Sequence, residues 1–438
     1  MLKSSFIKNT GVLFSGSLIA QLIGFGVVPI LSRIYNPEDF GALGLFNSMV
    51  AIVTVFSGLR YEMAIVVEED RSKARALTQL SMLWNIIIGL ILMIVIVLSK
   101  NWIAGLFGIN KPEWLYLVAP VIILSGMLES LIFWRNRERQ FRLISANRVL
   151  SSATAASYKL THPYINLPNN GLIIGHSIGQ LLAFLHLWWK SGIQLFQFDS
   201  SLLKSLMKEY KDFPLYSAPA ALINILAVKM PFFLIAYYAG MEATGFLDNA
   251  NRLTYLPLSM VAMASSQVFF ERIARVKKDK KQSAEMSHQL VNFLFFLGVL
   301  PVSILFVFGD DIVSWILGAN WHQSGVYVQI LILFYFSIFL TSPFSSAFEA
   351  YQKLKQQLVY NLIFLVCTSL AMWWAYETYE LTTKALMAYA ATALVLRLII
   401  LNYFFKLFGK SLLLKSLFGI LITYLLIWLL FRIDSFLF

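Results

Sequence analysis

Residues 77–98 read LTQLSMLWNIIIGLILMIVIVL, a stretch of 22 residues without a charged side chain. A helix needs about 20 predominantly apolar residues to cross the hydrocarbon core of a bilayer. Arg75 and Lys100 lie just beyond the two ends of this stretch, where their charged groups can reach the polar membrane surfaces. The stretch is therefore predicted to be a transmembrane helix.

Further apolar runs repeat this pattern along the whole chain. Of the 438 residues, 58% are hydrophobic and 13% are charged, whereas about 25% of the residues in a soluble domain are charged. The mean hydropathy is +0.70, and this composition excludes a soluble enzyme and a disordered scaffold. The predicted spans are 11–31, 42–67, 77–98, 115–134, 144–161, 170–189, 216–238, 246–269, 289–308, 325–348, 357–376, 383–404 and 413–431.

Basic residues are divided unevenly between the alternate connections. One set of connections holds 25 of the 35 Lys and Arg residues, the other holds five, and the remaining five lie in spans or at their ends. Because Lys and Arg are retained on the cytoplasmic side of a membrane, the larger set and the N-terminus are predicted to be cytoplasmic. The net charge of +12 is thus explained by membrane topology, and no nucleic-acid partner is expected.

The connection at about 190–215 divides the chain into six spans, six further spans and a final one. We expect an N-terminal six-helix bundle in 1–200, a C-terminal six-helix bundle in 201–405 and an additional hydrophobic helix in 406–438. Leucines and lysines alternate at helical spacing in 202–211. This pattern predicts an amphipathic helix on the membrane surface.

Two segments in corresponding places of the two halves resemble each other. Residues 29–47 read PILSRIYNPEDFGALGLFN, and residues 231–249 read PFFLIAYYAGMEATGFLDN. Each has a proline within a span, a tyrosine at its exit, an acidic residue, and then Phe-Gly or Thr-Gly at the start of the next span. With six spans in each half, the halves are predicted to be parallel repeats related by an axis along the membrane normal.

Ionisable residues are rare within the spans, where a charge is costly and usually faces a cavity. Arg60 and Arg252 occupy the second helix of each half, so a pseudo-twofold axis is expected to place both in one central cavity. Guanidinium groups match phosphate oxygens, which favours an anionic substrate. Lys229, and Arg33 at the outer end of the first span, are further candidate cations. Candidates for coupling to a proton or a sodium ion are Glu62, Glu129 and Asp248.

The same charged residues also have structural interpretations. Asp248 and Arg252 are four residues apart and can pair on one helix face. On a continuous helix Arg60 and Glu62 point about 200° apart, which excludes such a simple pair. Arg397 and Glu129 lie nearer the ends of their spans, so we expect them to extend toward water.

The sequence contains no recognisable catalytic or metal-binding set. Cys367 is the only cysteine, and His176 and His186 lie on different faces of one predicted span. Residues 409–411 read GKS, as at the end of a phosphate-binding loop, but Phe404 occupies the position of its first glycine. No cofactor is expected.

Several short motifs in both halves together point to a known family. In the first half they are Asn9-Thr10-Gly11, Gly16-Ser17, Gln21, Pro29, Arg33-Ile34-Tyr35 and Pro37-Glu38-Asp39-Phe40-Gly41. In the second half they are Pro214, Pro219-Ala220, Asn224, Pro231, Glu242-Ala243-Thr244-Gly245-Phe246, Arg252 and Pro257. This pattern resembles the bacterial polysaccharide flippases, the O-antigen and capsule repeat-unit translocases of the multidrug/oligosaccharidyl-lipid/polysaccharide exporter superfamily.

This resemblance implies a fold and a function. It implies two six-helix bundles in a MATE-like V around a central cavity, in the bacterial inner membrane. The implied activity is flipping of an undecaprenyl-diphosphate-linked oligosaccharide to the outer leaflet by alternating access, for lipopolysaccharide O-antigen or capsule assembly together with a polymerase. Related peptidoglycan-precursor flippases carry cavity arginines in the first, second and eighth helices. Arg60 and Arg252 match the last two, whereas the first helix has only Arg33 at its end.

Two alternatives to this function remain open from the sequence. An ion-coupled multidrug exporter of the same superfamily would favour acidic rather than basic cavity residues, because many of its substrates are cations. A polysaccharide polymerase or ligase would need a sizeable external loop with catalytic residues, and the external connections predicted here are short.

Overall fold

The computed structural model describes residues 15–165, 170–194, 199–276, 279–351 and 353–409. Every regular element in these ranges is a helix, and ten helical segments among them are long and apolar enough to cross a membrane. The predicted thirteenth span, 413–431, lies outside the described residues. The protein is thus an all-helical membrane protein, as the apolar runs predict.

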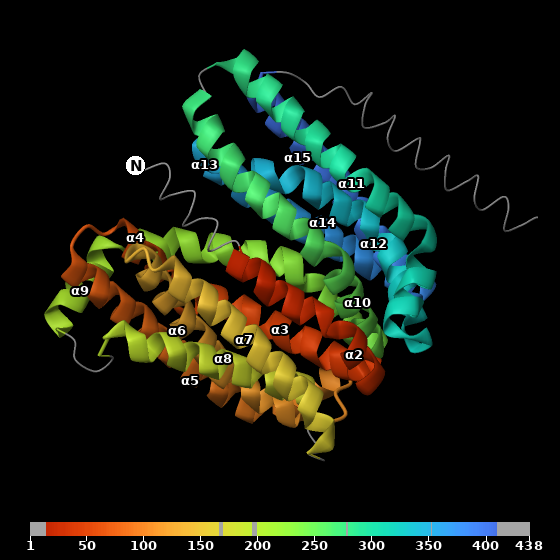
Figure 1. Cartoon of the computed structure of the whole chain (residues 1–438), viewed down its shortest axis with the longest axis horizontal. Helices are drawn as coiled ribbons and strands as arrows, with labels where there is room; N and C mark the ends of the chain where they lie inside the picture. Colours follow the sequence, from red (N-terminus) through yellow and green to blue (C-terminus); the bar gives the residue numbers. More distant parts are fainter. Residues whose placement is uncertain (1–14, 166–169, 195–198, 277–278, 352, 410–438) are drawn as a thin grey trace, which may run out of the picture. The chain divides into compact units, whose positions relative to one another are not determined.

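The chain forms two compact units, Met1–Gly245 and Phe246–Phe438. The 59-residue helix α10 (Ala218–Val276) contributes to both units and contains one non-helical residue, Gly240. The other α-helices of the first unit (Figure 1) are α2 (Val28–Ile34), α3 (Pro37–Ser57), α4 (Tyr61–Val67), α5 (Arg71–Leu106), α6 (Val118–Arg137), α7 (Phe141–Thr161), α8 (Gly171–Ser191) and α9 (Ser200–Glu209). Those of the second are α11 (Lys280–Leu317), α12 (His322–Thr341), α13 (Ala347–Ala350), α14 (Leu354–Tyr379) and α15 (Thr382–Leu407).

Several helices extend beyond the apolar runs that predict them. Residues 77–98 form the middle of the 36-residue helix α5, which begins earlier because the Asp70 carboxylate accepts hydrogen bonds from the backbone N–H groups of Ser72 and Lys73. Such a cap stabilises a helix end that lies outside the apolar run. The length of that run therefore does not predict where the helix begins. The predicted spans 216–238 and 246–269 lie within the single helix α10, on either side of Gly240. The division of the chain into 1–200, 201–405 and 406–438 stays a prediction.

The core of the first unit lies between α4, α5, α6, α8 and α9. Leu77 and Leu131 are fully buried there, and so is Leu206 of α9. Leu203 belongs to the same cluster. The apolar face of α9 therefore packs on the protein, and the position of α9 at the membrane surface stays a prediction. A helix that packs on a protein core and a helix that packs on lipid have the same amphipathic pattern, because both environments are apolar.

A hydrogen bond attaches the end of α9 to the end of α4. The Tyr210 hydroxyl donates to the Glu68 carboxylate at 2.7 Å. Burial and this hydrogen bond to an anion raise the pKa of Tyr210 to about 12. Burial alone would raise the pKa of Glu68, but the Tyr210 hydroxyl and the backbone N–H of Asp70 outweigh it and hold that pKa below its usual range. The link therefore favours a charged Glu68 at neutral pH.

The two similar segments of the sequence contact each other through their glycines. A Cβ atom on Gly41 would lie 1.8 Å from the carbonyl oxygen of Met241, and one on Gly245 would lie 1.9 Å from that of Pro37. The contact is reciprocal, because each glycine meets the carbonyl of the residue four positions before the other glycine. Only glycine allows two helices to approach so closely.

The second unit has a core rich in phenylalanine. The Phe344 ring packs against those of Phe269, Phe405 and Phe408, with centroids 4.9–5.9 Å apart. A second cluster at Leu294, Ile332 and neighbouring apolar residues joins α11 to α12. Edge-to-face pairs of this kind add to the stabilisation from burial.

Candidate functional site

The predicted second span, 42–67, is interrupted toward its C-terminal end. Helix α3 ends at Ser57, and α4 begins at Tyr61. Between them the backbones of Leu59 and Arg60 are left-handed, with φ of 51° and 61°. This conformation costs an L-residue about 1–2 kcal/mol and persists only where the surroundings determine it, often at a functional site. The prediction of one continuous helix here is therefore wrong.

The break changes the partners of Arg60. Its Nη1 lies 3.8 Å from Glu62 Oε1, which two residues on a continuous helix could not achieve. Nη2 contacts the Met63 sulfur at 2.9 Å, and Nε is buried without a hydrogen-bond partner. The side chain is 18% exposed. The Arg60 guanidinium thus keeps donors available beside a carboxylate that holds it only loosely.

Glu62 lies at the start of a buried chain of hydrogen bonds. The residue is only 4% exposed, and the Ser81 hydroxyl donates to its carboxylate at 3.3 Å. The Ser81 and Ser130 hydroxyls are 2.9 Å apart. Ser130 also donates to the carbonyl of Gly126 at 3.0 Å. The chain therefore runs from α4 through α5 to the backbone of α6.

A second pair of polar residues completes this buried network. The Ser57 hydroxyl donates to the Asn85 side-chain carbonyl, and the Asn85 amide donates to the carbonyl of Ser81 at 2.8 Å. Two glycines provide the space: a Cβ on Gly58 would lie 2.5 Å from the Ser81 hydroxyl, and one on Gly126 would lie 1.9 Å from the Asn85 carbonyl oxygen. Glycine is thus required at both positions for the network to form.

Glu129 belongs to the same cluster. It interacts electrostatically with both Arg60 and Glu62, and it is partly buried rather than extended into water. The first unit therefore brings three of the predicted residues together. The sequence indicated each one separately, but not their proximity.

The second unit contains the predicted pair of Asp248 and Arg252. Arg252 Nε donates to Asp248 Oδ2 at 2.6 Å, and Asp248 is 5% exposed. The predicted pairing across one helical turn of α10 is confirmed. The pair neutralises Arg252 more completely than Glu62 neutralises Arg60, because its two charged atoms are closer.

The other two predicted cations have local contacts. The Lys229 ammonium lies 5.3 Å from the ring centre of Phe232, one turn along α10. Arg33 is exposed at the end of α2, and its Nη1 donates to the carbonyl of Pro29 at 2.6 Å. Both contacts are with residues of the same helix.

The sequence-based interpretation of Arg397 is wrong. This residue lies in the middle third of α15, and its guanidinium carbon is 5.2 Å from the ring centre of Phe364. Its Nε is buried without a hydrogen-bond partner, so the side chain does not extend freely to water. The signal available in the sequence was an arginine well inside an apolar run.

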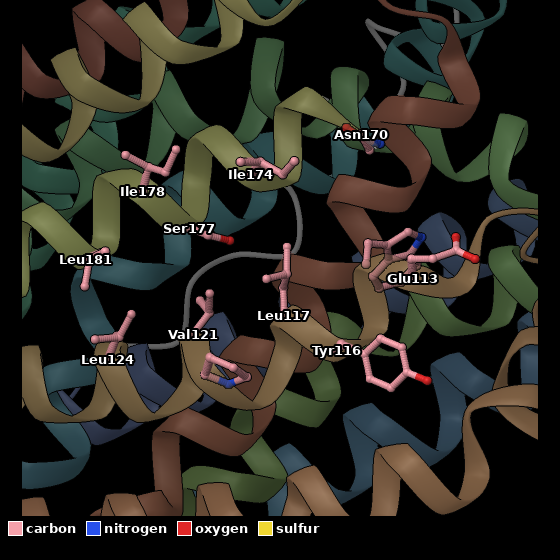
Figure 2. Close-up of a pocket in the computed structure, with 12 residues that line it drawn as sticks. Glu113, Tyr116, Leu117, Val121, Leu124, Asn170, Ile174, Ser177, Ile178 and Leu181 are labelled. Atoms are coloured by element: carbon pink, nitrogen blue, oxygen red, sulfur yellow. The ribbon is translucent and has the colours of Figure 1, made fainter. Parts of the chain in front are cut away.

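A groove of about 450 Å³ lies between α6, with the 3₁₀ turn before it, and α8. Figure 2 shows Leu117, Val121 and Ile178 along its walls, with Glu113 and Asn170 together toward one end. Its walls are mostly apolar, and none of the predicted site residues lines it. The groove is therefore separate from the charged cluster around Arg60.

Comparisons with known proteins agree with this architecture. The family described as "Polysaccharide biosynthesis protein" matches residues 30–326. The chain is 24% identical over 356 residues to the Lsg locus putative protein 1 of Haemophilus influenzae, covering 77% of this chain and 82% of the relative. It is 23% identical over 266 residues to the succinoglycan biosynthesis transport protein ExoT of Rhizobium meliloti, covering 60% of this chain and 52% of the relative.

A solved structure shows the same fold. The inward closed conformation of the lipid II flippase MurJ superposes with a TM-score of 0.75 over 95% of this chain and 92% of that one, at 16% sequence identity. MATE transporters of the MOP superfamily have the same fold, at TM-scores near 0.6. The chain therefore belongs to the family described as "Polysaccharide biosynthesis protein".

Proposed function

We propose that this transporter flips an undecaprenyl-diphosphate-linked oligosaccharide repeat unit from the cytoplasmic to the outer leaflet of a bacterial inner membrane. The repeat unit would serve O-antigen or capsule assembly, with a polymerase acting on the product. Family membership and the relative named for succinoglycan transport support a saccharide as the substrate class. The observation that carries the proposal is the strained break that holds Arg60 beside a buried carboxylate inside a predicted span.

Arg60 is suited to bind and release a diphosphate. Its ion pair with Glu62 spans 3.8 Å, near the upper limit for such a contact, so the carboxylate can be exchanged for a phosphate at small cost. Nε has no partner to lose. A flippase must release its cargo as well as bind it, which favours a cation that already has a weak internal counter-ion. Arg252, Lys229 and Arg33 are proposed to supply further positive charge along the path.

Glu62 is proposed to couple transport to a proton. When Arg60 turns to a phosphate, Glu62 loses this cationic partner and remains buried. A protonated Glu62 can donate to Ser81, Ser81 can donate to Ser130, and Ser130 can donate to the Gly126 carbonyl. This direction of the chain satisfies every hydroxyl. Glu129 and Asp248 are proposed to be secondary carboxylates in the same coupling.

A leaflet assay with purified protein tests this function. Proteoliposomes would contain a fluorescently labelled undecaprenyl-diphosphate oligosaccharide, and an impermeant quencher would report the outer-leaflet fraction. We expect the protein to equalise the leaflets, and protein-free vesicles to remain asymmetric. In cells, deletion should leave the lipid-linked unit on the cytoplasmic leaflet and abolish the surface polysaccharide. Persistence of that polysaccharide without a redundant flippase would contradict the proposal.

A further inference from the structure

Arg397 of the second unit has no carboxylate partner among the described residues. Its Nε has no hydrogen-bond partner. Arg252 in the same unit is neutralised by Asp248 at 2.6 Å. An unpaired guanidinium within a transmembrane segment is costly, and residues of this kind usually belong to a substrate path. Arg397 is thus better placed than Arg252 to receive an external anion.

Aromatic side chains surround Arg397. Besides Phe364, which lies beneath the guanidinium, Tyr255 of α10, Tyr360 of α14 and Tyr389 of α15 interact with it electrostatically. The Tyr360 hydroxyl is buried without a hydrogen-bond partner. This cluster therefore combines a guanidinium whose Nε has no hydrogen-bond partner with a tyrosine hydroxyl that has none, both within one unit.

Ring packing holds the cluster in place. Phe334 of α12 lies 5.3 Å from the Tyr389 ring and 6.3 Å from the Phe364 ring, centroid to centroid. The Tyr360 ring is 6.1 Å from that of Phe364. Three helices thus fix the aromatic walls, while Arg397, Tyr255 and Tyr360 remain half-buried rather than sealed. Each of the three side chains therefore keeps part of its surface accessible.

We propose that Arg397, Tyr255 and Tyr360 form a subsite for an oxyanion of the transported molecule. Aromatic faces pack against the C–H bonds of a sugar ring, and phenol hydroxyls bond to its oxygens. The surroundings therefore favour the carboxylate of an acidic sugar over the lipid diphosphate. The inference rests on the proposed function, and it adds that the repeat unit carries a negatively charged sugar.

Binding measurements on the full-length protein in detergent test the subsite without requiring transport. The probes are a glucuronic-acid disaccharide, a glucose disaccharide of the same linkage, and geranyl diphosphate, each titrated by calorimetry. We expect the wild-type protein to bind the glucuronic-acid probe at least about tenfold more tightly than the glucose probe, a difference of about 1.4 kcal/mol. Arg397→Gln should remove that preference and leave the affinity for geranyl diphosphate unchanged.

Two further variants serve as controls. Lys384→Gln removes an exposed cation from the same helix and should leave all three affinities unchanged. Tyr360→Phe should weaken the glucuronic-acid probe about threefold, because only one hydroxyl is lost. Should Arg397→Gln fail to reach wild-type membrane levels, Arg397→Lys replaces it, and a partial loss is expected because Lys lacks the planar fork.

The outcomes separate the hypotheses. Loss of geranyl diphosphate binding alone in Arg397→Gln would assign the oxyanion subsite to the lipid carrier instead of the sugar. Wild-type affinity for both anions in the Arg397 variants and in Tyr360→Phe would overturn the subsite. A protein that shows the sugar preference but fails the leaflet assay would refute the proposed function and leave the subsite standing.

Discussion

At the level of single residues, the left-handed backbone at Leu59 and Arg60 determines which charges meet. On a regular helix Arg60 and Glu62 would point in different directions. The break turns Arg60 back toward Glu62, to 3.8 Å. The strain is maintained by the packed polar network around Gly58, where any larger residue would collide with Ser81. We therefore regard the break as part of the site.

The role of Arg60 can be separated from its contribution to stability by a double substitution. Arg60→Gln alone leaves Glu62 buried without its counter-ion, which is expected to lower the melting temperature, by less than the roughly 3–5 kcal/mol typical of a tight buried pair because the contact spans 3.8 Å. Arg60→Gln combined with Glu62→Gln removes both charges and should restore most of the melting temperature. Transport in the leaflet assay should nevertheless stay at least about tenfold below wild type, which corresponds to about 1.4 kcal/mol. Normal transport by the double variant would refute a role for Arg60 in substrate binding.

At the level of elements, the crossing of α3 and α10 depends on two glycines. The repeated Phe-Gly and Thr-Gly motifs of the sequence place Gly41 and Gly245 at one reciprocal backbone contact. The sequence showed that the two segments are alike. It could not show that they are in contact, because sequence similarity between two segments does not determine the distance between them.

Alanine at either glycine tests this contact. Gly41→Ala would place a methyl group 1.8 Å from the Met241 carbonyl oxygen, and Gly245→Ala would place one 1.9 Å from that of Pro37. Each should cost about 1–3 kcal/mol through overpacking, seen as a lower melting temperature in detergent. The matched control is Gly105→Ala in α5, where a Cβ meets no atom within 4 Å. Equal melting temperatures for all three variants would contradict the contact.

At the level of the whole molecule, the uneven distribution of Lys and Arg predicts the orientation of every span. The prediction depends on the number of spans, since one missed helix would invert all later connections. The described helices match twelve of the thirteen predicted spans when α7, which is not among the ten segments apolar enough to cross a membrane, is added and α10 is counted as two. The thirteenth span lies outside the described residues. The orientation itself therefore needs a direct measurement.

Cysteine labelling measures that orientation. In a Cys367→Ser background, single cysteines replace Asn110, before α6, or Ser72, in the first turn of α5. Both positions are exposed and uncharged, so neither substitution alters the distribution of Lys and Arg that orients the spans. A membrane-impermeant maleimide should label Asn110→Cys in cells with a permeabilised outer membrane, and Ser72→Cys only after lysis. The reverse result would invert the proposed topology.

The sequence by itself determined the class of molecule, the positions of most membrane helices, the similarity between the two halves and the charged residues within the spans. These depend on hydropathy over about 20 residues and on residue type, which are local properties. Only the tertiary structure decided that α9 packs on the protein, that Arg60 pairs with Glu62 across a broken helix, and that Arg397 lacks a carboxylate among the described residues while Arg252 has one. These features depend on which side chains from separate helices share a low-dielectric interior, where the presence or absence of one partner decides the behaviour of a charge.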